Sequence, residues 1–367
     1  MGTWTRRSLC GLLPSLLHAA AASSGKGTEL TTERKRYPDP ATEFEVMRLT
    51  EATYESILPA APARIFSRKS DFFLFASNRT GSMQGFRMEM KTGAWKQITQ
   101  AETLSADSLV LMPQDRLFCH FDGPNLMLAS LSGGKDRVVY EVPSGWQHTG
   151  ALHVSDDGVN AFAVEKKDQT FRLRMIPVNR GSATTLAEQP KLIQMIGSRP
   201  RRASFLYQVD DALVIVNLDG TQNRKLKTEA GKVATGIWSP DGRTIIYLHL
   251  PGETTRLNAL REFTPDTNQD AFIANTSQFV TFASNADASV FLGASRSKAS
   301  PDVLLLLRAS RRELTLAEHK AVSPSDVRLR FAPSSERILF QTDKHGKQAI
   351  YTMDVHRLVE VTEADEK

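Results

Sequence analysis

The sequence contains little cysteine. Only Cys10 and Cys119 occur in 367 residues, too few for a disulfide framework or for a thiolate zinc site. Neither sign of charge is in large excess, because 46 basic and 41 acidic residues leave a formal net charge of only +5. Since no long basic run is present to follow a phosphate backbone, the chain is not expected to bind nucleic acid.

Long apolar runs are missing after the N-terminal stretch. No later run exceeds five residues, the length of Val303–Leu307, which suits a buried strand and is too short to span a bilayer. The Gly-x-Ser-x-Gly pattern of the α/β-hydrolase nucleophile elbow is absent as well. Hydrophobic residues nevertheless make up 41% of the chain, so a large core can form and disorder of the whole chain is excluded.

Residues 1–22 have the parts of a secretory signal. Arg6 and Arg7 precede a short apolar stretch, residues 9–17, and a run of alanines follows. This pattern predicts export to the periplasm or out of the cell, by either the general or the twin-arginine route. A disordered amphipathic tail is the alternative interpretation.

The rest of the chain repeats. Short runs rich in β-branched and aromatic residues, such as Phe72–Ser77, alternate with polar turns. The turns recur at intervals of 40 to 49 residues, a period typical of propeller blades built from four short strands. The seven turns are Ser70–Asp71, Gln114–Asp115, Asp157–Gly158, Arg201–Arg202, Asp241–Gly242, Ala286–Asp287 and Ser335–Glu336. The sequence therefore predicts an all-β fold, a seven-bladed β-propeller of four-stranded antiparallel blades, over residues 46–361.

The last predicted blade is incomplete, because too few residues follow Ser335 for four strands. Val46–Thr50 has the pattern of a fourth strand and precedes the first full blade. We therefore predict that this N-terminal strand closes the ring, which removes an open sheet edge. Residues 23–45 are interpreted as a polar lead-in and residues 362–367 as a tail. Two stacked β-domains are the alternative architecture.

Several stretches resemble one known family in their sequence and in their order along the chain. They are Val142–Trp146, Val216–Lys225, Leu314–His319, Ile338–Asp343 and Ala349–Val355. The family is that of the oligogalacturonate lyases, propellers that are distantly similar to TolB-type propellers, and the resemblance covers about Arg36 to Val355. It implies β-elimination on short galacturonate oligomers, which needs a base for the C5 proton and positive charge or a metal beside the carboxylate.

The residues that the resemblance implies for this chemistry are replaced. The family holds manganese with a Gln-x-x-His-Pro-His-Pro-x-Phe segment, and the matching Ser323–Phe331 contains neither histidine nor glutamine. Gln278 occupies the place of a further metal-binding histidine, Thr235 that of the base, and Ala212 that of an arginine. Manganese is thus expected for the family, while no cofactor is expected to bind here.

Four residues remain as candidates for substrate binding. Arg328 and Arg330 are placed to face a uronate carboxylate, because a guanidinium binds a carboxylate with two hydrogen bonds. His148 begins a predicted inner strand, where propellers place pocket residues, and a purely structural histidine is the alternative. Gln278 is a candidate through the family position that it occupies. No catalytic residue is identified.

Three other features have structural interpretations. Cys119 lies in an apolar run and is predicted to be a buried, inert thiol. The Asp156–Asp157 pair has the oxygens for Ca²⁺, although turn formation explains it. His319 falls at a predicted strand end and is expected to be exposed to solvent.

Two functions stay open at this point. The first is an exported lyase-like propeller that acts on or binds pectic fragments, by β-elimination if it is active. The second is a propeller without catalysis that serves in the periplasm for ligand binding or protein assembly. The expected partner is accordingly an acidic oligosaccharide or another protein, with no membrane span after removal of the signal.

Overall fold

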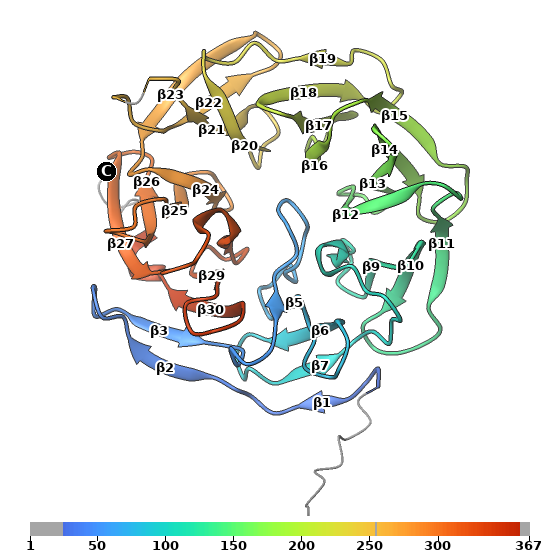
Figure 1. Ribbon diagram of the computed structural model, residues 1–367, viewed down its shortest axis with the longest axis horizontal. Coiled ribbons are helices and arrows are strands. Elements are labelled where there is room, and N and C mark those ends of the chain that lie inside the picture. The colour runs from blue at the N-terminus through green and yellow to red at the C-terminus, as the bar shows by residue number, and fades with distance from the viewer. Residues whose placement is uncertain (1–24, 254, 360–367) are drawn as a thin grey trace, which may run out of the picture.

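Seven antiparallel sheets surround a central axis in the computed structural model of the chain (Figure 1). The structure describes residues 25–253 and 255–359. The predicted all-β fold, a seven-bladed β-propeller, is confirmed. The signal predicted for residues 1–22 and the tail of residues 362–367 lie outside the described residues. No helix in the described part of the chain has the length and hydrophobicity that crossing a bilayer requires.

Each blade runs from an inner strand at the axis to an outer strand at the rim. Blade 1 consists of β4 (Ser56–Ile57), β5 (Phe72–Ser77), β6 (Gln84–Glu89), β7 (Trp95–Gln97) and β1 (Glu29–Leu30); blade 2 of β8 (Val110–Leu111), β9 (Leu117–Asp122), β10 (Asn125–Ser130) and β11 (Arg137–Glu141). Blade 3 consists of β12 (Gln147–Val154), β13 (Asn160–Lys167), β14 (Thr170–Pro177) and β15 (Thr184–Gln189); blade 4 of β16 (Ile193–Ser198), β17 (Ser204–Val209), β18 (Ala212–Asn217) and β19 (Arg224–Lys225).

The remaining blades complete the ring. Blade 5 consists of β20 (Lys232–Trp238), β21 (Ile245–Leu250), β22 (Ala259–Thr264) and β23 (Gln269–Asn275); blade 6 of β24 (Phe279–Ser284), β25 (Val290–Ser295), β26 (Asp302–Leu307) and β27 (Arg312–Glu318). Blade 7 consists of β28 (Arg328–Phe331), β29 (Arg337–Thr342), β30 (Ala349–Asp354), β3 (Glu45–Arg48) and β2 (Lys35–Pro38). Two short 3₁₀ helices, η1 (Ala106–Ser108) and η2 (Pro324–Asp326), precede the inner strands of blades 2 and 7.

The same turn follows the inner strand in every blade. The backbone N–H of one residue donates to the carbonyl oxygen five positions later over 2.8–3.1 Å, and the donors are Ser67, Met112, Ser155, Arg199, Ser239, Asn285 and Ala332. They recur at intervals of 40 to 47 residues, close to the predicted period. Each turn also contains a residue with positive φ, which is glycine only at Gly158 and Gly242. Because glycine adopts this conformation without strain, those two turns gave the clearest sequence pattern.

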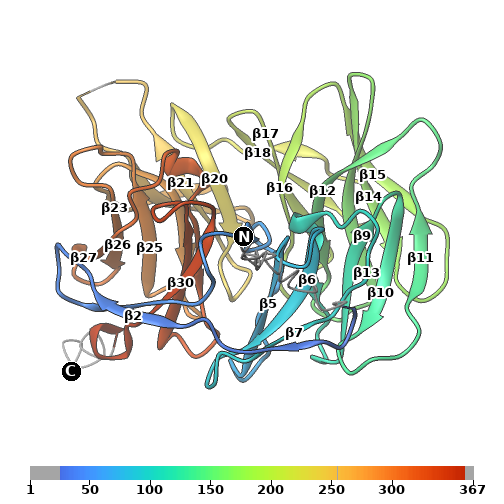
Figure 2. The same cartoon turned by 60° about the horizontal axis from the view of Figure 1, so that its bottom comes forward.

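Strands from the two ends of the chain complete blade 7. β3 pairs antiparallel with β30, Met47 standing opposite Thr352, and β2 pairs with β3 (Figure 2). The predicted N-terminal closing strand is therefore confirmed, although β3 begins one residue earlier and ends two residues earlier than Val46–Thr50. The segment interpreted as a lead-in contributes two more strands, β2 in blade 7 and β1 at the rim of blade 1.

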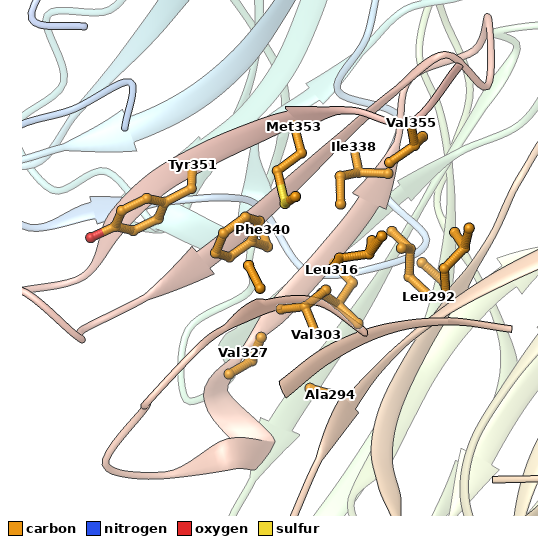
Figure 3. Close-up of a cluster of buried hydrophobic side chains, with 14 of the residues drawn as sticks. Leu292, Ala294, Val303, Leu316, Val327, Ile338, Phe340, Tyr351, Met353 and Val355 are labelled. Atoms are coloured by element: carbon orange, nitrogen blue, oxygen red, sulfur yellow. The ribbon is translucent and has the colours of Figure 1, made fainter. Parts of the chain in front are cut away.

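The hydrophobic cores lie between neighbouring blades. Figure 3 shows the cluster of blades 6 and 7, in which Leu292 and Val303 pack with Ile338, Phe340 and Tyr351. Val46 of β3 belongs to this cluster, whereas the next residue, Met47, packs in the cluster of blade 1. Successive side chains of a strand point to opposite faces. The closing strand therefore joins two cores, one on each of its faces.

Met47→Ala should lower the free energy of unfolding by about 2 to 5 kcal/mol, because truncation of a buried methionine leaves a cavity between blades 7 and 1. Glu45→Ala is the matched control, since this exposed side chain of the same strand should change stability by less than about 0.5 kcal/mol. Denaturant unfolding measures both variants. Equal losses in the two would contradict a packing role for the closing strand.

Candidate functional site

The inner strands β4, β8, β12, β16, β20, β24 and β28 stand around the axis (Figure 1). Since the same turn ends each of them, all begin at one face of the ring, here called the amino face, and end at the other, the carboxyl face. The inner strand of blade 1 is interrupted between β4 and an isolated bridge from Phe66 to Phe73. The intervening residues 58–65, here called the axial segment, form the blue loop that reaches the middle of the ring in Figure 1.

Arg328, the first residue of β28, holds the axial segment at the amino face. Its Nη1 donates to the carbonyl oxygen of Leu58 and to a carboxylate oxygen of Asp107 in η1. The side chains of Arg328 and Asp107 are 27% and 39% exposed. The guanidinium predicted to face a ligand carboxylate therefore faces a carboxylate of the chain itself, in a pair that solvent can reach.

Arg330 lies two residues further along β28 and binds the axial segment without a carboxylate. Its Nη2 donates to the carbonyl oxygen of Pro59 over 2.5 Å and its Nη1 to that of Leu329 over 3.2 Å. No carboxylate oxygen of the described residues lies within ion-pair distance of it. Burial first, and then the charge of Arg328, lowers the pKa of Arg330 to about 9. Arg330 thus has no direct ion pair, and the nearby carboxylate of Asp107, which pairs with Arg328, offsets its lowered pKa only in part.

His148 lies on β12, and both of its ring nitrogens are occupied. The ring stacks on Phe121 at 4.0 Å, Nε2 donates to the carbonyl oxygen of Gly123 over 2.9 Å, and Nδ1 accepts from the N–H of Gly150 over 3.1 Å. Burial lowers its pKa, so the neutral form fits these bonds. These contacts fit the alternative interpretation, in which His148 has a purely structural role.

Gln278 stands in an exposed turn just before β24, with a φ of 60°. Its backbone N–H donates to the carbonyl oxygen of Thr276, and its own carbonyl oxygen accepts from Arg296. Of the four predicted binding residues, β28 brings Arg328 and Arg330 together. Within the described residues no hydrogen bond or ion pair joins His148 or Gln278 to these two arginines.

A cavity of about 290 Å³ opens in the carboxyl half of the channel, beneath the axial segment. Its polar lining includes Arg330, His153 and Ser198, and Trp238 belongs to its wall. His153 Nε2 lies 2.7 Å from Ser198 Oγ. Sequence reasoning selected Arg330 as a candidate but did not select His153, Ser198 or Trp238. Their position in the repeat could have identified them, because each stands directly before a repeated turn, at the carboxyl end of an inner strand.

The three structural interpretations have different outcomes. Cys119 is completely buried, and burial raises its pKa to about 12, as expected of an inert thiol. Asp157 accepts bonds from Ser155 Oγ and the N–H of Val159 within its own turn. The prediction for His319 was wrong, because it is fully buried with Nε2 3.0 Å from the carbonyl oxygen of Ser295.

Two curated proteins named as lyases are similar to this chain in sequence. An oligogalacturonide lyase of Pectobacterium atrosepticum and an oligogalacturonate lyase of Dickeya dadantii are each 24% identical over 382 residues, covering 90% of this chain and 98% of theirs. The chain is similar to the oligogalacturonate lyases. The resemblance inferred from the motifs is therefore confirmed. No family model matches the chain.

Solved structures of lyases share the fold of this lyase-like propeller. An oligogalacturonate lyase in complex with manganese has a TM-score of 0.83 at 21% identity, covering 90% of this chain and 98% of that one. The oligogalacturonate lyase of Vibrio parahaemolyticus has a TM-score of 0.82 at 20% identity, covering 90% and 99%. At this identity the likeness establishes the propeller architecture and leaves the chemistry to the residues of the site.

The residues at the implied metal positions of the lyase-like propeller do not fit manganese. Asp326 offers one carboxylate, Ser323 Oγ lies 3.0 Å from Ser325 Oγ, and Arg328 brings a positive charge in place of an imidazole. Within residues 25–253 and 255–359, no group of three or more His, Cys, Asp or Glu side chains could hold a metal ion. Thr235 and Ala212, at the implied positions of base and arginine, lie on β20 and β18.

Stability should fall as the pH drops from about 6.5 towards 4. Burial lowers the pKa of both His120 and His153 from 6.5 to about 4, so in this window the unfolded chain binds more protons than the folded one. Each histidine should contribute up to about 1.4 kcal/mol per pH unit. Denaturant unfolding across this range, repeated for His153→Gln and His120→Phe, measures the slope. Unchanged slopes in both variants would contradict their neutral folded state.

Proposed function

We propose that this lyase-like propeller binds acidic oligosaccharides of the pectin type and does not cleave them by metal-dependent β-elimination. The observation that carries the proposal is the ion pair of Arg328 with Asp107 at the amino face of the channel. A guanidinium stands where the resemblance implies a metal ligand. It can bind a uronate carboxylate directly, with two parallel hydrogen bonds.

A ligand carboxylate would replace Asp107 on Arg328. Both side chains are more than a quarter exposed, and ion pairs in contact with solvent contribute only about 0 to 1 kcal/mol. Exchange of one carboxylate for another therefore costs little. Asp107 keeps the guanidinium in place before the ligand arrives, and then competes with it.

Elimination requires a base that removes a proton from carbon, and the matching position offers none. Thr235 has a hydroxyl group that does not ionise near neutral pH. The second candidate function is nevertheless an active lyase, because the similarity to the two curated lyases spans 98% of their length. An active enzyme would need a base and an electrophile at positions other than those implied by the family.

Location and partner belong to the same proposal. The pattern of residues 1–22 supports export, so we propose that the protein acts in the periplasm or outside the cell. A protein partner is the alternative ligand for the amino face.

Purified protein incubated with oligogalacturonate, with and without Mn²⁺, should bind it by calorimetry and should not produce the ultraviolet absorbance of an unsaturated uronate. Absence of the product follows from the lack of a base at Thr235. Absorbance that grows with time would establish a lyase instead. If neither binding nor product is observed, the proposal that the protein binds an acidic oligosaccharide is wrong.

Substitutions at the ion pair test the binding mode. Arg328→Ala should weaken binding of oligogalacturonate at least tenfold, since a charge-assisted hydrogen bond contributes about 1.5 to 3 kcal/mol. Asp107→Asn should strengthen it several-fold, because the competing carboxylate is gone. Arg243→Ala, which removes an arginine with a largely exposed side chain from a blade 5 turn, is the control. Unchanged affinity in Arg328→Ala would end the proposal.

A further inference from the structure

The cavity in the carboxyl half of the channel lies away from the Arg328–Asp107 pair. The carboxyl ends of β12, β16, β20, β24 and β28 form its wall, and the axial segment covers one side. Most of its lining is apolar and includes Pro62, Leu206, Ile237, Phe282 and Phe331. Its volume of about 290 Å³ is near the lower end of the roughly 300 to 1,000 Å³ found for small-molecule sites.

Equivalent positions around the ring show which lining residues are unusual. Two residues before the donor of each repeated turn stand Ile65, Val110, His153, Gly197, Ile237, Ala283 and Arg330. Five of these seven are apolar or glycine, as expected beside a packed axis. The two polar ones, His153 and Arg330, both line the cavity. Packing of the ring explains the five residues and does not explain these two.

Hydrogen bonding fixes the tautomer of His153. Its Nε2 accepts from the backbone N–H of Ser198 over 3.1 Å and lies 2.7 Å from Ser198 Oγ. Because a backbone N–H can only donate, Nε2 carries the lone pair and the proton of the neutral ring is on Nδ1. This Nδ1–H group is buried and has no acceptor among the described residues.

Two more residues of the wall have a buried donor without an acceptor in the part of the chain described. They are Trp238, through Nε1–H, and Arg330, through Nε–H. All three unsatisfied groups of the lining residues are therefore donors. Buried donors without partners are unfavourable. The three nitrogens have almost no accessible surface in this structure, so a ligand group that supplies acceptors would reach them after small movements of the wall side chains.

The charge of Arg330 selects an anion among such groups. No carboxylate of the described chain lies within ion-pair distance of this partly buried guanidinium, and a cation that is partly removed from water without a direct partner is unfavourable. Asp156 is the acidic residue of the lining, and it is exposed to solvent. A carboxylate fits the interior best, since its two oxygens accept several hydrogen bonds and carry one negative charge.

We propose that this cavity binds a small carboxylic acid with an apolar body. Its carboxylate accepts hydrogen bonds from Arg330, His153 and Trp238, and its body packs against Pro62, Ile237 and Phe282. The proposal does not depend on oligosaccharide binding at the amino face, because the two sites use different residues. The axial segment takes part in both, since its carbonyl groups hold Arg328 and Arg330.

Calorimetry with phenylacetate and its neutral amide, phenylacetamide, tests the proposal on the full-length protein. Phenylacetate should bind saturably with one molecule per chain, and phenylacetamide at least tenfold more weakly. Arg330→Gln should weaken phenylacetate binding at least tenfold, whereas Arg243→Ala, on an exposed turn of the same face, should leave it unchanged.

Trp238→Phe keeps the ring in the wall and removes one donor, so it serves as a milder variant if Arg330→Gln does not fold. It should weaken phenylacetate several-fold and leave phenylacetamide unchanged. The proposal is overturned if phenylacetate shows no saturable binding up to its solubility, if acid and amide bind equally well, or if Trp238→Phe and a folded Arg330→Gln bind phenylacetate like the unmodified protein.

Discussion

The pairing of β3 with β30 is the constraint on which the rest of this structure depends. Each blade packs only against its two neighbours. Until the ring closes, the first and the last blade therefore each leave one surface without a neighbouring blade. β3 supplies both the missing backbone hydrogen bonds and a side chain to each of two cores, Val46 on one face and Met47 on the other. Only in a closed ring do seven inner strands face one axis, and the candidate sites lie along that axis.

The axis is occupied by the chain itself. Regular pairing of the first inner strand stops after Ile57, and the axial segment crosses the channel between β28 and β16. Its backbone carbonyl oxygens neutralise part of the charge of Arg328 and Arg330, and its Pro62 packs against Gly197. The segment thereby divides one channel into an opening at the amino face and a cavity towards the carboxyl face, and each holds one guanidinium.

Local signals made the architecture predictable, and distant contacts made the site unpredictable. Turns at a constant interval report blades because each blade is a local unit, and Val46–Thr50 was recognisable as an extra strand by its own pattern. The partner of Arg328 is 221 residues away along the chain, and nothing in the sequence around Asp107 points to it. His319 was expected at the surface because a strand end does not reveal that the neighbouring blade covers it. The residues of the cavity wall, among them His153 and Trp238, likewise meet only once the ring closes.

The positive charge at the axis disfavours a bound divalent cation more strongly than the missing ligands do. Side chains two residues apart on a strand share a face, so Arg328 and Arg330 both reach the channel from β28, and the charge of Arg328 helps to lower the pKa of Arg330. A divalent cation placed there would meet two guanidinium groups, of which one lacks a carboxylate partner in the described chain. An anion at the same place would be attracted by both guanidinium groups and would reduce the repulsion between them. The arginine that stands at the position of an implied imidazole ligand therefore gives this part of the channel an electrostatic preference for anions over cations.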